Sequence, residues 1–229
     1  MNRDKVVIVT GAQGILGNAV VAAFAAAGAH VAALDVTGGA SHGELRCTNF
    51  QVDVTDVQAA RLTMTKIREQ FGRIDVLANI AGGFQWESIV TGSIETWDRM
   101  YAVNLRTVVA ASQAALPHLL DAAPGSRIIN IAAAAAASAA ATGMGAYAAS
   151  KAGVIKFTES LADEVKHRGL TVNAILPSII DTPRNRADMQ DADFTKWVSP
   201  QEIAKVALFL ASAEAQPITG AAIAVTGRV

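Results

Sequence analysis

The chain has one cysteine, almost no net charge and no long uninterrupted hydrophobic run in its 229 residues. A single cysteine, Cys47, cannot form an intramolecular disulfide, and this usage fits a reducing compartment. A formal net charge of −1 does not supply the basic surface that nucleic acids or anionic membranes attract. The alanine-rich runs at residues 22–29 and 132–141 are too short or too interrupted to cross a bilayer. We therefore expect no nucleic-acid partner and no membrane partner.

We also expect no secretion signal, because residues 2–5 (NRDK) lead directly into an apolar strand-like run. Together with the cysteine usage, this predicts a cytoplasmic protein. What the sequence does contain is apolar residues, at 52% of the chain. That composition and this length suit one compact domain, residues 1–229, with a core of three layers.

Short apolar runs alternate with helical patterns along the whole chain. The predicted strands are residues 5–10, 30–34, 48–52, 74–78, 128–131, 171–176 and 221–225. Between them lie helical patterns, namely a helix ending at Ala27 and those at residues 57–71, 97–120, 147–167 and 200–211. This alternation predicts an α/β fold of the Rossmann type, a doubly wound parallel sheet covered by helices on both faces.

The first predicted strand runs into TGAQGILG at residues 10–17. Glycines at a strand-to-helix turn let the backbone approach a pyrophosphate, whose charge the helix N-terminus stabilises. Asp35 ends the second strand, where a carboxylate can accept the ribose hydroxyls of NAD and repels the 2′-phosphate of NADP. Neither Gln13 nor residues 36–38 supply a compensating cation. The sequence predicts a dinucleotide site that favours NAD(H) over NADP(H).

Tyr147 and Lys151 are four residues apart, so on a helix they share one face. A free phenol has a pKa near 10 and needs help to exchange a proton near neutral pH. A neighbouring ammonium favours the phenolate and lowers that pKa. A lowering of about three units corresponds to roughly 4 kcal/mol of differential stabilisation. We expect Tyr147 to act as a proton donor or acceptor that Lys151 makes more acidic.

The glycine-rich turn followed by the Tyr–Lys pair resembles the short-chain dehydrogenase/reductase family over essentially the whole chain. The resemblance implies catalytic roles for Tyr147, Lys151 and Asn104, and no metal. It implies a small-molecule substrate and a homodimer or homotetramer built on the two longest helices. The segment NIAGG at residues 79–83 resembles the family's NNAG motif, in which Asn79 is expected to have a structural role and tie neighbouring strands together. By resemblance and position, the expected cofactor-binding residues are Gly11, Gln13, Gly14, Ile15, Leu16, Gly17, Asp35, Asp53, Val54, Asn79, Ala81, Gly82, Tyr147, Lys151, Pro177, Ile180 and Thr182.

One departure from the family concerns the substrate. Family members usually place a serine about thirteen residues before the tyrosine, to bond the substrate oxygen. Here that position is Ala134, every residue from 132 to 137 is alanine, and Ser138 is the nearest hydroxyl. Losing one preorganised donor costs on the order of 3 kcal/mol, or about 10²–10³ in rate. The sequence therefore suggests an already electrophilic substrate, or another group in place of the serine.

Three further features resemble the dihydropteridine reductases, which also lack the serine. They are the G-x-x-G-x-x-G spacing, a short crossover at residues 37–44 without a helical pattern, and a polar lid-like segment at residues 181–197 (DTPRNRADMQDADFTKW). In that segment Arg184 and Arg186 could face the substrate or only solvent. Phe84 and Trp86, in the loop after the fourth strand, could stack on a flat substrate or merely pack the loop.

Three functional hypotheses remain open. The first is an NADH-dependent reductase of a quinonoid dihydropterin or a similar activated ring, with Tyr147 as the proton donor. The second is an alcohol dehydrogenase or ketone reductase, of the 3-oxoacyl type for example, with Ser138 or a water in place of the missing donor. The third is a non-catalytic NAD-binding sensor. Asn104 could serve a proton relay or a purely structural bond, since a polar residue in its apolar setting needs a partner.

Overall fold

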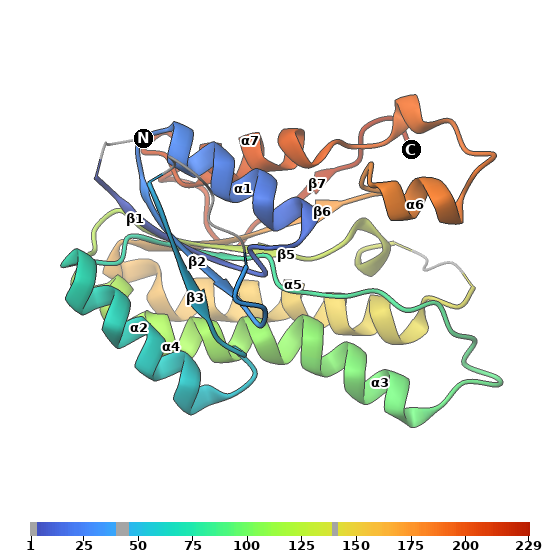
Figure 1. The fold of residues 1–229 in the computed structure, drawn as a ribbon, viewed down its shortest axis with the longest axis horizontal. Coiled ribbons are helices and arrows are strands. Elements are labelled where there is room, and N and C mark those ends of the chain that lie inside the picture. Colours follow the sequence, from blue (N-terminus) through green and yellow to red (C-terminus); the bar gives the residue numbers. More distant parts are fainter. Residues whose placement is uncertain (1–3, 40–45, 139–141) are drawn as a thin grey trace.

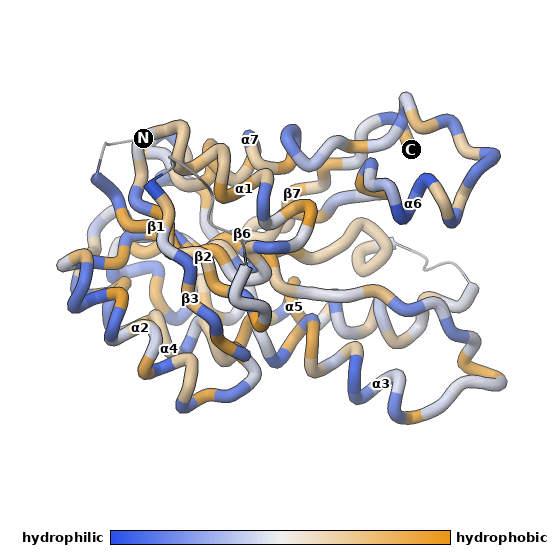
Figure 2. The backbone as a smooth tube through the Cα atoms, in the orientation of Figure 1, coloured by the Kyte–Doolittle hydropathy of each residue, from blue (hydrophilic) through white to orange (hydrophobic). Residues whose placement is uncertain are grey.

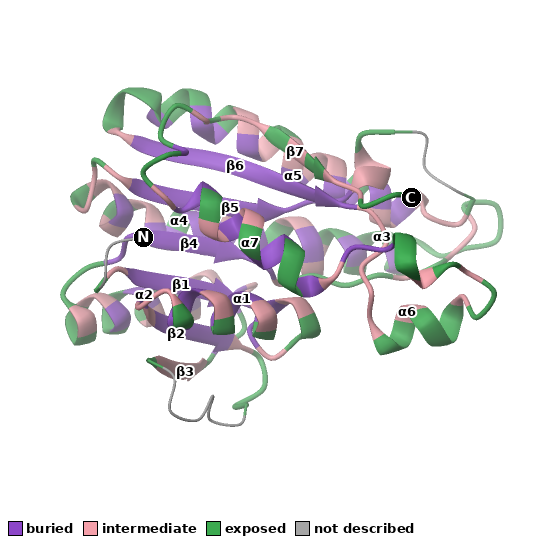
Figure 3. Cartoon of the chain, turned by 90° about the horizontal axis from the view of Figure 1, so that it is seen from above, coloured by how far each residue is buried: buried purple, intermediate pink, exposed green. Residues whose placement is uncertain are grey.

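The structure is a computed structural model that describes residues 4–39, 46–138 and 142–229. Its centre is a parallel sheet of seven strands in the order β3-β2-β1-β4-β5-β6-β7 (Figures 1 and 3). The strands are β1 (Val6–Thr10), β2 (His30–Asp35), β3 (Cys47–Gln51), β4 (Val76–Asn79), β5 (Ser126–Ile131), β6 (Leu170–Pro177) and β7 (Ala222–Val225). The predicted α/β fold with a doubly wound parallel sheet is confirmed.

Helices cover both faces of this sheet, as Figure 1 shows. One face carries α1 (Ile15–Ala26) and α7 (Pro200–Leu210), and the other carries α2 (Val57–Phe71), α4 (Thr107–Asp121) and α5 (Gly145–Val165). Alternate residues of β1 serve the two cores: Val7 and Val9 pack on the α1 face, whereas Val6 and Ile8 pack on the α2 face. A strand buried on both faces has to be apolar throughout, which explains the continuous runs in the sequence. In Figure 2 the strands at the centre are coloured mainly as hydrophobic, in agreement with this layering.

Two predicted helix starts are confirmed by their caps. Asp56 precedes α2 and its carboxylate accepts hydrogen bonds from the amides of Gln58 and Ala59, at 2.9 and 3.1 Å. Ser199 precedes α7 and forms a reciprocal capping box with Glu202. Both caps depend only on neighbouring residues, so the sequence is sufficient to predict them.

The single long helix predicted at residues 97–120 is wrong in detail. The structure has α3 (Ile94–Tyr101), a π-helical turn (Ala102–Arg106) and then α4. α3 also begins earlier than predicted, because the Ser93 hydroxyl accepts a hydrogen bond from the Thr96 amide and caps the helix. A π-turn widens the helix and often marks a functional site. This one presents Asn104, whose contacts are described below.

The crossover between β2 and β3 contains no helix in its described residues, 36–39 and 46; residues 40–45 lie outside the described part of the chain. By the register of β3 against β2, Asn49 and Gln51 point to the same face as Ala33 and Asp35, the face that carries α1. Because Asn49 and Gln51 are polar, this face of β3 does not need to be covered by an apolar helix between β2 and β3. The opposite face of β3 carries Phe50, which packs against the core under α2.

The segment predicted to form a lid contains more regular structure than its weak periodicity suggested. It forms α6 (Pro183–Asp188), capped by the Thr182 hydroxyl, and a 3₁₀ turn (Phe194–Lys196). In Figure 1, α6 and the loop before α3 project at the same end of the molecule, that of the carboxyl ends of the strands. Among the described helices, none combines the length and the apolar character that a membrane crossing requires.

Candidate active site

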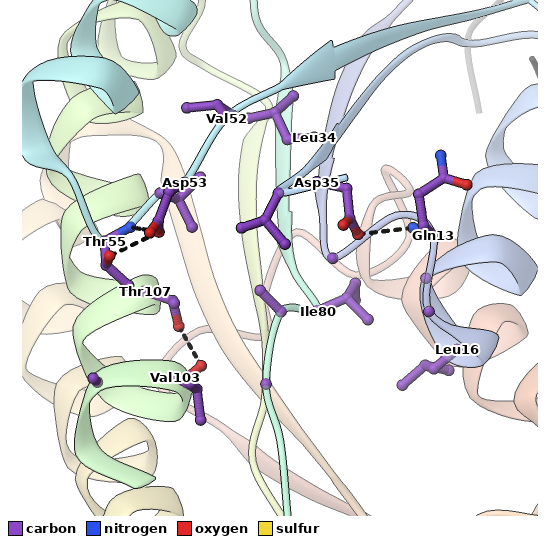
Figure 4. Close-up of a pocket in the computed structure, with 18 of the residues that line it drawn as sticks. Gln13, Leu16, Leu34, Asp35, Val52, Asp53, Thr55, Ile80, Val103 and Thr107 are labelled. Atoms are coloured by element: carbon purple, nitrogen blue, oxygen red, sulfur yellow. Dashed lines mark hydrogen bonds between the residues drawn. The ribbon is translucent and has the colours of Figure 1, made fainter. Parts of the chain in front are cut away.

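A cleft of about 760 Å³ opens at the carboxyl ends of β1, β2 and β4 (Figure 4). Strand order reverses at β1, and ligands of doubly wound sheets bind at such a switch point. Of the predicted cofactor-binding residues, the cleft is lined by Gly11, Gln13, Gly14, Ile15, Leu16, Gly17, Asp35, Asp53, Val54, Ala81 and Gly82. Sequence reasoning missed Leu34, Val36, Val52, Thr55, Ile80, Ala102, Val103 and Thr107, which also line it. Most of these directly adjoin predicted residues, but which neighbours face the cleft depends on the turns.

The first and third glycines of the glycine-rich turn occupy positions at which a side chain would not fit. Gly11 has φ +65°, and a Cβ there would lie 2.7 Å from the Cα of Ala81. A Cβ on Gly17 would overlap the carbonyl oxygen of Gly11. The first and third glycines are therefore required by the fold of the turn itself. The exposed backbone that results, at the N-terminus of α1, fits a pyrophosphate group.

Two carboxylates are held in the cleft by short local hydrogen bonds (Figure 4). Asp35 accepts from the amide of Gln13 at 3.0 Å through one oxygen, and from the amide and hydroxyl of Thr37 through the other. Asp53 accepts from the amide and hydroxyl of Thr55, at 2.8 and 2.7 Å. Asp35 thus lies at the end of β2 over the glycine-rich turn, where the sequence placed a ribose-binding carboxylate.

Lys151 is buried beside the end of this cleft. Only 4% of the residue is exposed, and its ammonium donates to the carbonyl of Ile131, the last residue of β5, at 2.7 Å. A Cβ on Gly82 would lie 3.2 Å from Lys151 Nζ and 2.8 Å from Asn104 Oδ1. Because Gly82 lines the cleft, the structure brings together the dinucleotide site, Lys151 and Asn104, which are far apart in the sequence.

The predicted electrostatic effect of Lys151 on Tyr147 is not what the structure shows. Burial raises the pKa of Tyr147 to about 12, and burial lowers the pKa of Lys151 to about 8. Spacing along a helix predicts proximity, but it cannot predict how much water both groups lose. The raised pKa of Tyr147 comes from desolvation by burial, and no opposing effect of the Lys151 ammonium accompanies it. The phenol is therefore firmly protonated near neutral pH.

Asn104 holds the loop after β4 against α5. Its amide oxygen accepts from the Gly83 amide at 2.9 Å, and its amide nitrogen donates to the Gly83 carbonyl at 3.0 Å and to Ser150 Oγ at 3.1 Å. Ser150, which sequence reasoning missed, donates in turn to the carbonyl of Tyr147 at 2.7 Å. These bonds support the structural role of Asn104, and its part in a proton relay stays a prediction.

Asn79 does not line the cleft with the other predicted cofactor-binding residues, and its contacts agree with the structural role expected for it. It is 1% exposed, and its amide nitrogen donates to Asn130 Oδ1 at 2.8 Å and to Ser112 Oγ at 3.1 Å. Asn130 belongs to β5, so Asn79 ties two neighbouring strands together. Its contribution is to hold the strand ends that form the cleft.

Pro177 is the last residue of β6, and Ile180 and Thr182 follow it in the chain; none of the three lines the described cleft. The Ile180 carbonyl accepts from the Asn185 side chain at 2.8 Å, and the Thr182 hydroxyl accepts from the Asn185 amide at 3.1 Å. These two predicted cofactor-binding residues thus both accept hydrogen bonds from Asn185 in this structure. The Thr182 hydroxyl keeps its proton available for donation.

At the position where the family usually has a serine hydroxyl, this chain has the methyl group of Ala134. Ala134 begins a 3₁₀ turn (Ala134–Ala136), and the exposed Ser138 donates to the Ala134 carbonyl at 3.2 Å. In this structure the Ser138 hydroxyl donates to its own segment, and its part as a replacement donor to a substrate stays a prediction. Residues 139–141 lie outside the described part of the chain and are all alanine.

Comparison with known proteins identifies the class. The family model described as short chain dehydrogenase matches residues 5–193, and the chain belongs to this family. Among its relatives, the 3-oxoacyl-acyl-carrier-protein reductase of Thermotoga maritima is 33% identical over 239 residues, covering 97% of this chain and 96% of the relative. The protein is therefore an oxidoreductase of the short-chain dehydrogenase/reductase family, whose members bind a nicotinamide cofactor.

Solved structures agree with this assignment. The aldohexose dehydrogenase of Thermoplasma acidophilum, in ligand-free form, superposes with a TM-score of 0.88 at 33% identity, over 98% of this chain and 93% of that one. ElxO with NADP bound gives a TM-score of 0.90 at 25% identity, over 98% of both chains. The named substrates of these relatives are a 3-oxoacyl group and a sugar. The resemblance to dihydropteridine reductases therefore stays a prediction.

Proposed function

We propose that the protein is an NAD(H)-dependent oxidoreductase that interconverts a small ketone and the corresponding secondary alcohol, with Tyr147 as the proton donor and acceptor. The observation that carries this proposal is the buried ammonium of Lys151 beside Gly82, at the end of the dinucleotide cleft and four residues from Tyr147. The 3-oxoacyl reductase and the aldohexose dehydrogenase among the relatives act on carbonyl and hydroxyl groups, in agreement with this chemistry.

The nicotinamide cofactor supplies or accepts the hydride. The chain's own part in reduction is to deliver a proton to the substrate oxygen from the Tyr147 phenol, which its raised pKa keeps protonated near neutral pH. As negative charge develops on the phenol oxygen, the ammonium of Lys151 stabilises it. Burial strengthens that attraction at the moment of transfer, although it raises the pKa of Tyr147 in the resting protein.

The preference for NAD(H) rests on Asp35. Its carboxylate lies in the cleft, held by Gln13 and Thr37, where the 2′-phosphate of NADP would meet a like charge. Replacing it by Asp35→Ser removes that repulsion, which amounts to several kcal/mol for juxtaposed like charges. We expect the ratio of kcat/KM for NADPH over NADH to rise by roughly 10- to 100-fold. An unchanged ratio would show that Asp35 does not determine cofactor choice.

A second candidate substrate class is an activated conjugated ring such as a quinonoid dihydropterin. The observation that favours it is the methyl group of Ala134 in place of the family's hydroxyl donor, together with the engaged Ser138. A conjugated ring spreads the electron pair that the hydride brings, so less charge gathers on one oxygen and one fewer donor is needed. In a ketone the negative charge stays on the oxygen, so the absence of one hydrogen-bond donor lowers the rate by its full effect.

Hydride transfer monitored by NADH absorbance separates the two candidates. The panel contains 3-oxoacyl thioesters and cyclic ketones, sugars and polyols in the oxidative direction, and quinonoid dihydropterin with simple quinones. Turnover of the ketone and alcohol members supports the first candidate, and turnover confined to the conjugated rings supports the second. Activity that persists in Tyr147→Phe would contradict the assigned proton donor. No turnover across the panel would contradict both candidates.

A further inference from the structure

Two large aromatic side chains lie next to the catalytic tyrosine and remain open to solvent. The Phe84 ring packs edge-on against the Tyr147 ring, with centroids 4.9 Å apart and planes at 79°. The Trp86 ring packs in the same manner against Phe84, with centroids 5.9 Å apart and planes at 65°. Phe84 is 41% exposed and Trp86 is 60% exposed. We call Phe84 and Trp86 the aromatic wall.

The aromatic wall is fixed in place by the segment that leads into α5. The Glu87 amide donates to the Gly143 carbonyl at 2.8 Å. Gly143 has φ +79°, and a Cβ there would overlap the indole nitrogen of Trp86. The indole therefore lies directly on the backbone of Gly143, four residues before Tyr147. This arrangement fixes the wall to the same helix start that carries the catalytic phenol.

The polar groups of the site contact the start of the same loop. Gly83 links Phe84 to Asn104 through two hydrogen bonds, and Gly82, one residue earlier, lies beside Lys151 and lines the cleft. Five consecutive residues, 82–86, thus run from the dinucleotide cleft past the catalytic pair to the exposed aromatic rings. A substrate that accepts a hydride at the cleft and a proton from Tyr147 extends next along this loop.

We propose that the aromatic wall is a substrate subsite for a flat aromatic or conjugated ring that carries the reacting group or adjoins it. This inference rests on the proposed function, because it takes Tyr147 as the proton donor. A substrate oxygen bonded to the phenol lies about 2.7 Å from the phenol oxygen. Phe84, whose centroid is 4.9 Å from the Tyr147 ring, offers a partly exposed aromatic face beside that ring to a six-membered substrate ring. Aromatic rings prefer edge-to-face or offset contacts at such separations.

The subsite explains why these side chains are large, flat and uncovered at this position. Scattered exposed hydrophobic residues are ordinary, but two packed aromatic rings beside a catalytic group form a directed apolar surface. The wall applies to both candidate substrate classes, since a cyclic or aryl ketone and a conjugated ring both present a flat face. It disfavours open-chain aliphatic ketones and sugars, which lack one.

Matched substrates test the proposal. We expect Trp86→Ala to lower kcat/KM with NADH about three- to tenfold for an aryl or cyclic conjugated substrate, and less than about twofold for an open-chain ketone. Phe84→Leu, which keeps apolar volume and loses the flat ring, should show the same selectivity. Val90→Ala is the matched control, because Val90 is an exposed apolar residue of the same loop that is 92% exposed. Equal losses for ring and open-chain substrates would overturn the subsite.

A binding measurement separates failure of the subsite from failure of the proposed function. Flat aromatic carbonyl compounds and an oxidised pterin, titrated in the presence of NAD, should quench tryptophan fluorescence saturably, and Trp86→Phe should remove most of that quenching. Saturable quenching without turnover of any substrate would retain the subsite and contradict the proposed function. Turnover without ring selectivity and without quenching would overturn the subsite alone. Acrylamide quenching of the ligand-free protein tests whether another copy of the chain covers the aromatic wall. If acrylamide does not reach Trp86, and if Trp86→Ala dissociates an oligomer, the wall is an interface between copies and the subsite is overturned.

Discussion

Replacing the buried Lys151 by methionine should stabilise the ligand-free protein while abolishing its activity. Lys151 is 4% exposed, and burial lowers its pKa from 10.5 to about 8. Below pH 8 both the folded and the unfolded chain hold the proton, and the folded chain bears the full penalty of a desolvated ammonium. Between pH 8 and 10.5 only the unfolded chain holds the proton, so folded-state stability rises with pH. Above that window both forms are neutral and the penalty is gone.

The size of the effect follows from the pKa difference. A lowering from 10.5 to about 8 corresponds to about 3 kcal/mol of destabilisation at pH 7. Methionine has a similar length and no charge, but it leaves the Ile131 carbonyl without the hydrogen bond from Lys151, at a cost of about 1–3 kcal/mol. The expected net gain of Lys151→Met at pH 7 is therefore between about 0 and 2 kcal/mol, or up to roughly 8 °C in Tm for a chain of this length.

Thermal denaturation without cofactor, from about pH 6 to about pH 10, measures this gain. The advantage of the variant should be largest below pH 8 and should shrink as the pH rises toward 10.5. Lys156→Met is the matched control, since Lys156 lies on the same helix with its side chain 76% exposed. It should change Tm little at any pH. A stability difference between Lys151→Met and wild type that does not change as the pH rises from 7 toward 10.5 would refute the desolvation argument.

Three other variants address the chemistry and the fold. Tyr147→Phe should lower kcat by about 10²–10⁴ while NADH binding, followed by its fluorescence, is retained; normal turnover would remove the phenol from the mechanism. Ala134→Ser should raise ketone reduction by up to about 10² because it restores a donor, whereas Ser138→Ala should leave the rate unchanged, and the opposite pattern in steady-state kinetics would assign the donor to Ser138. Asp56→Ala should cost about 1 kcal/mol in urea denaturation because α2 loses its cap, and an unchanged midpoint would contradict that role.

The residues that line the cleft were mostly predictable from the sequence, because their positions depend on where each strand ends. The glycine-rich turn, Asp35 and Asp53 each follow the end of a strand. Parallel strands bring such ends to one edge of the sheet, so most of the predicted contacts line the same cleft. Asn79 is the last residue of β4, and its side chain bonds Asn130 on β5, in agreement with the structural role expected for it. The direction of a side chain at a strand end depends on packing, so spacing alone did not separate Asn79 from the residues that line the cleft.

The sequence by itself determined the order of strands and helices, the caps of α2 and α7 and the glycine-rich turn. Each of these follows from hydrophobic periodicity or from hydrogen bonds between residues a few positions apart. Only the tertiary structure decided the π-turn that presents Asn104, the contact of Phe84 with Tyr147 and the pKa values of the catalytic pair. Those depend on how much water the surrounding elements exclude and on contacts between segments far apart in the chain. Desolvation is a property of the packed protein, and it raised the pKa of Tyr147 where local charge alone predicted a lower one.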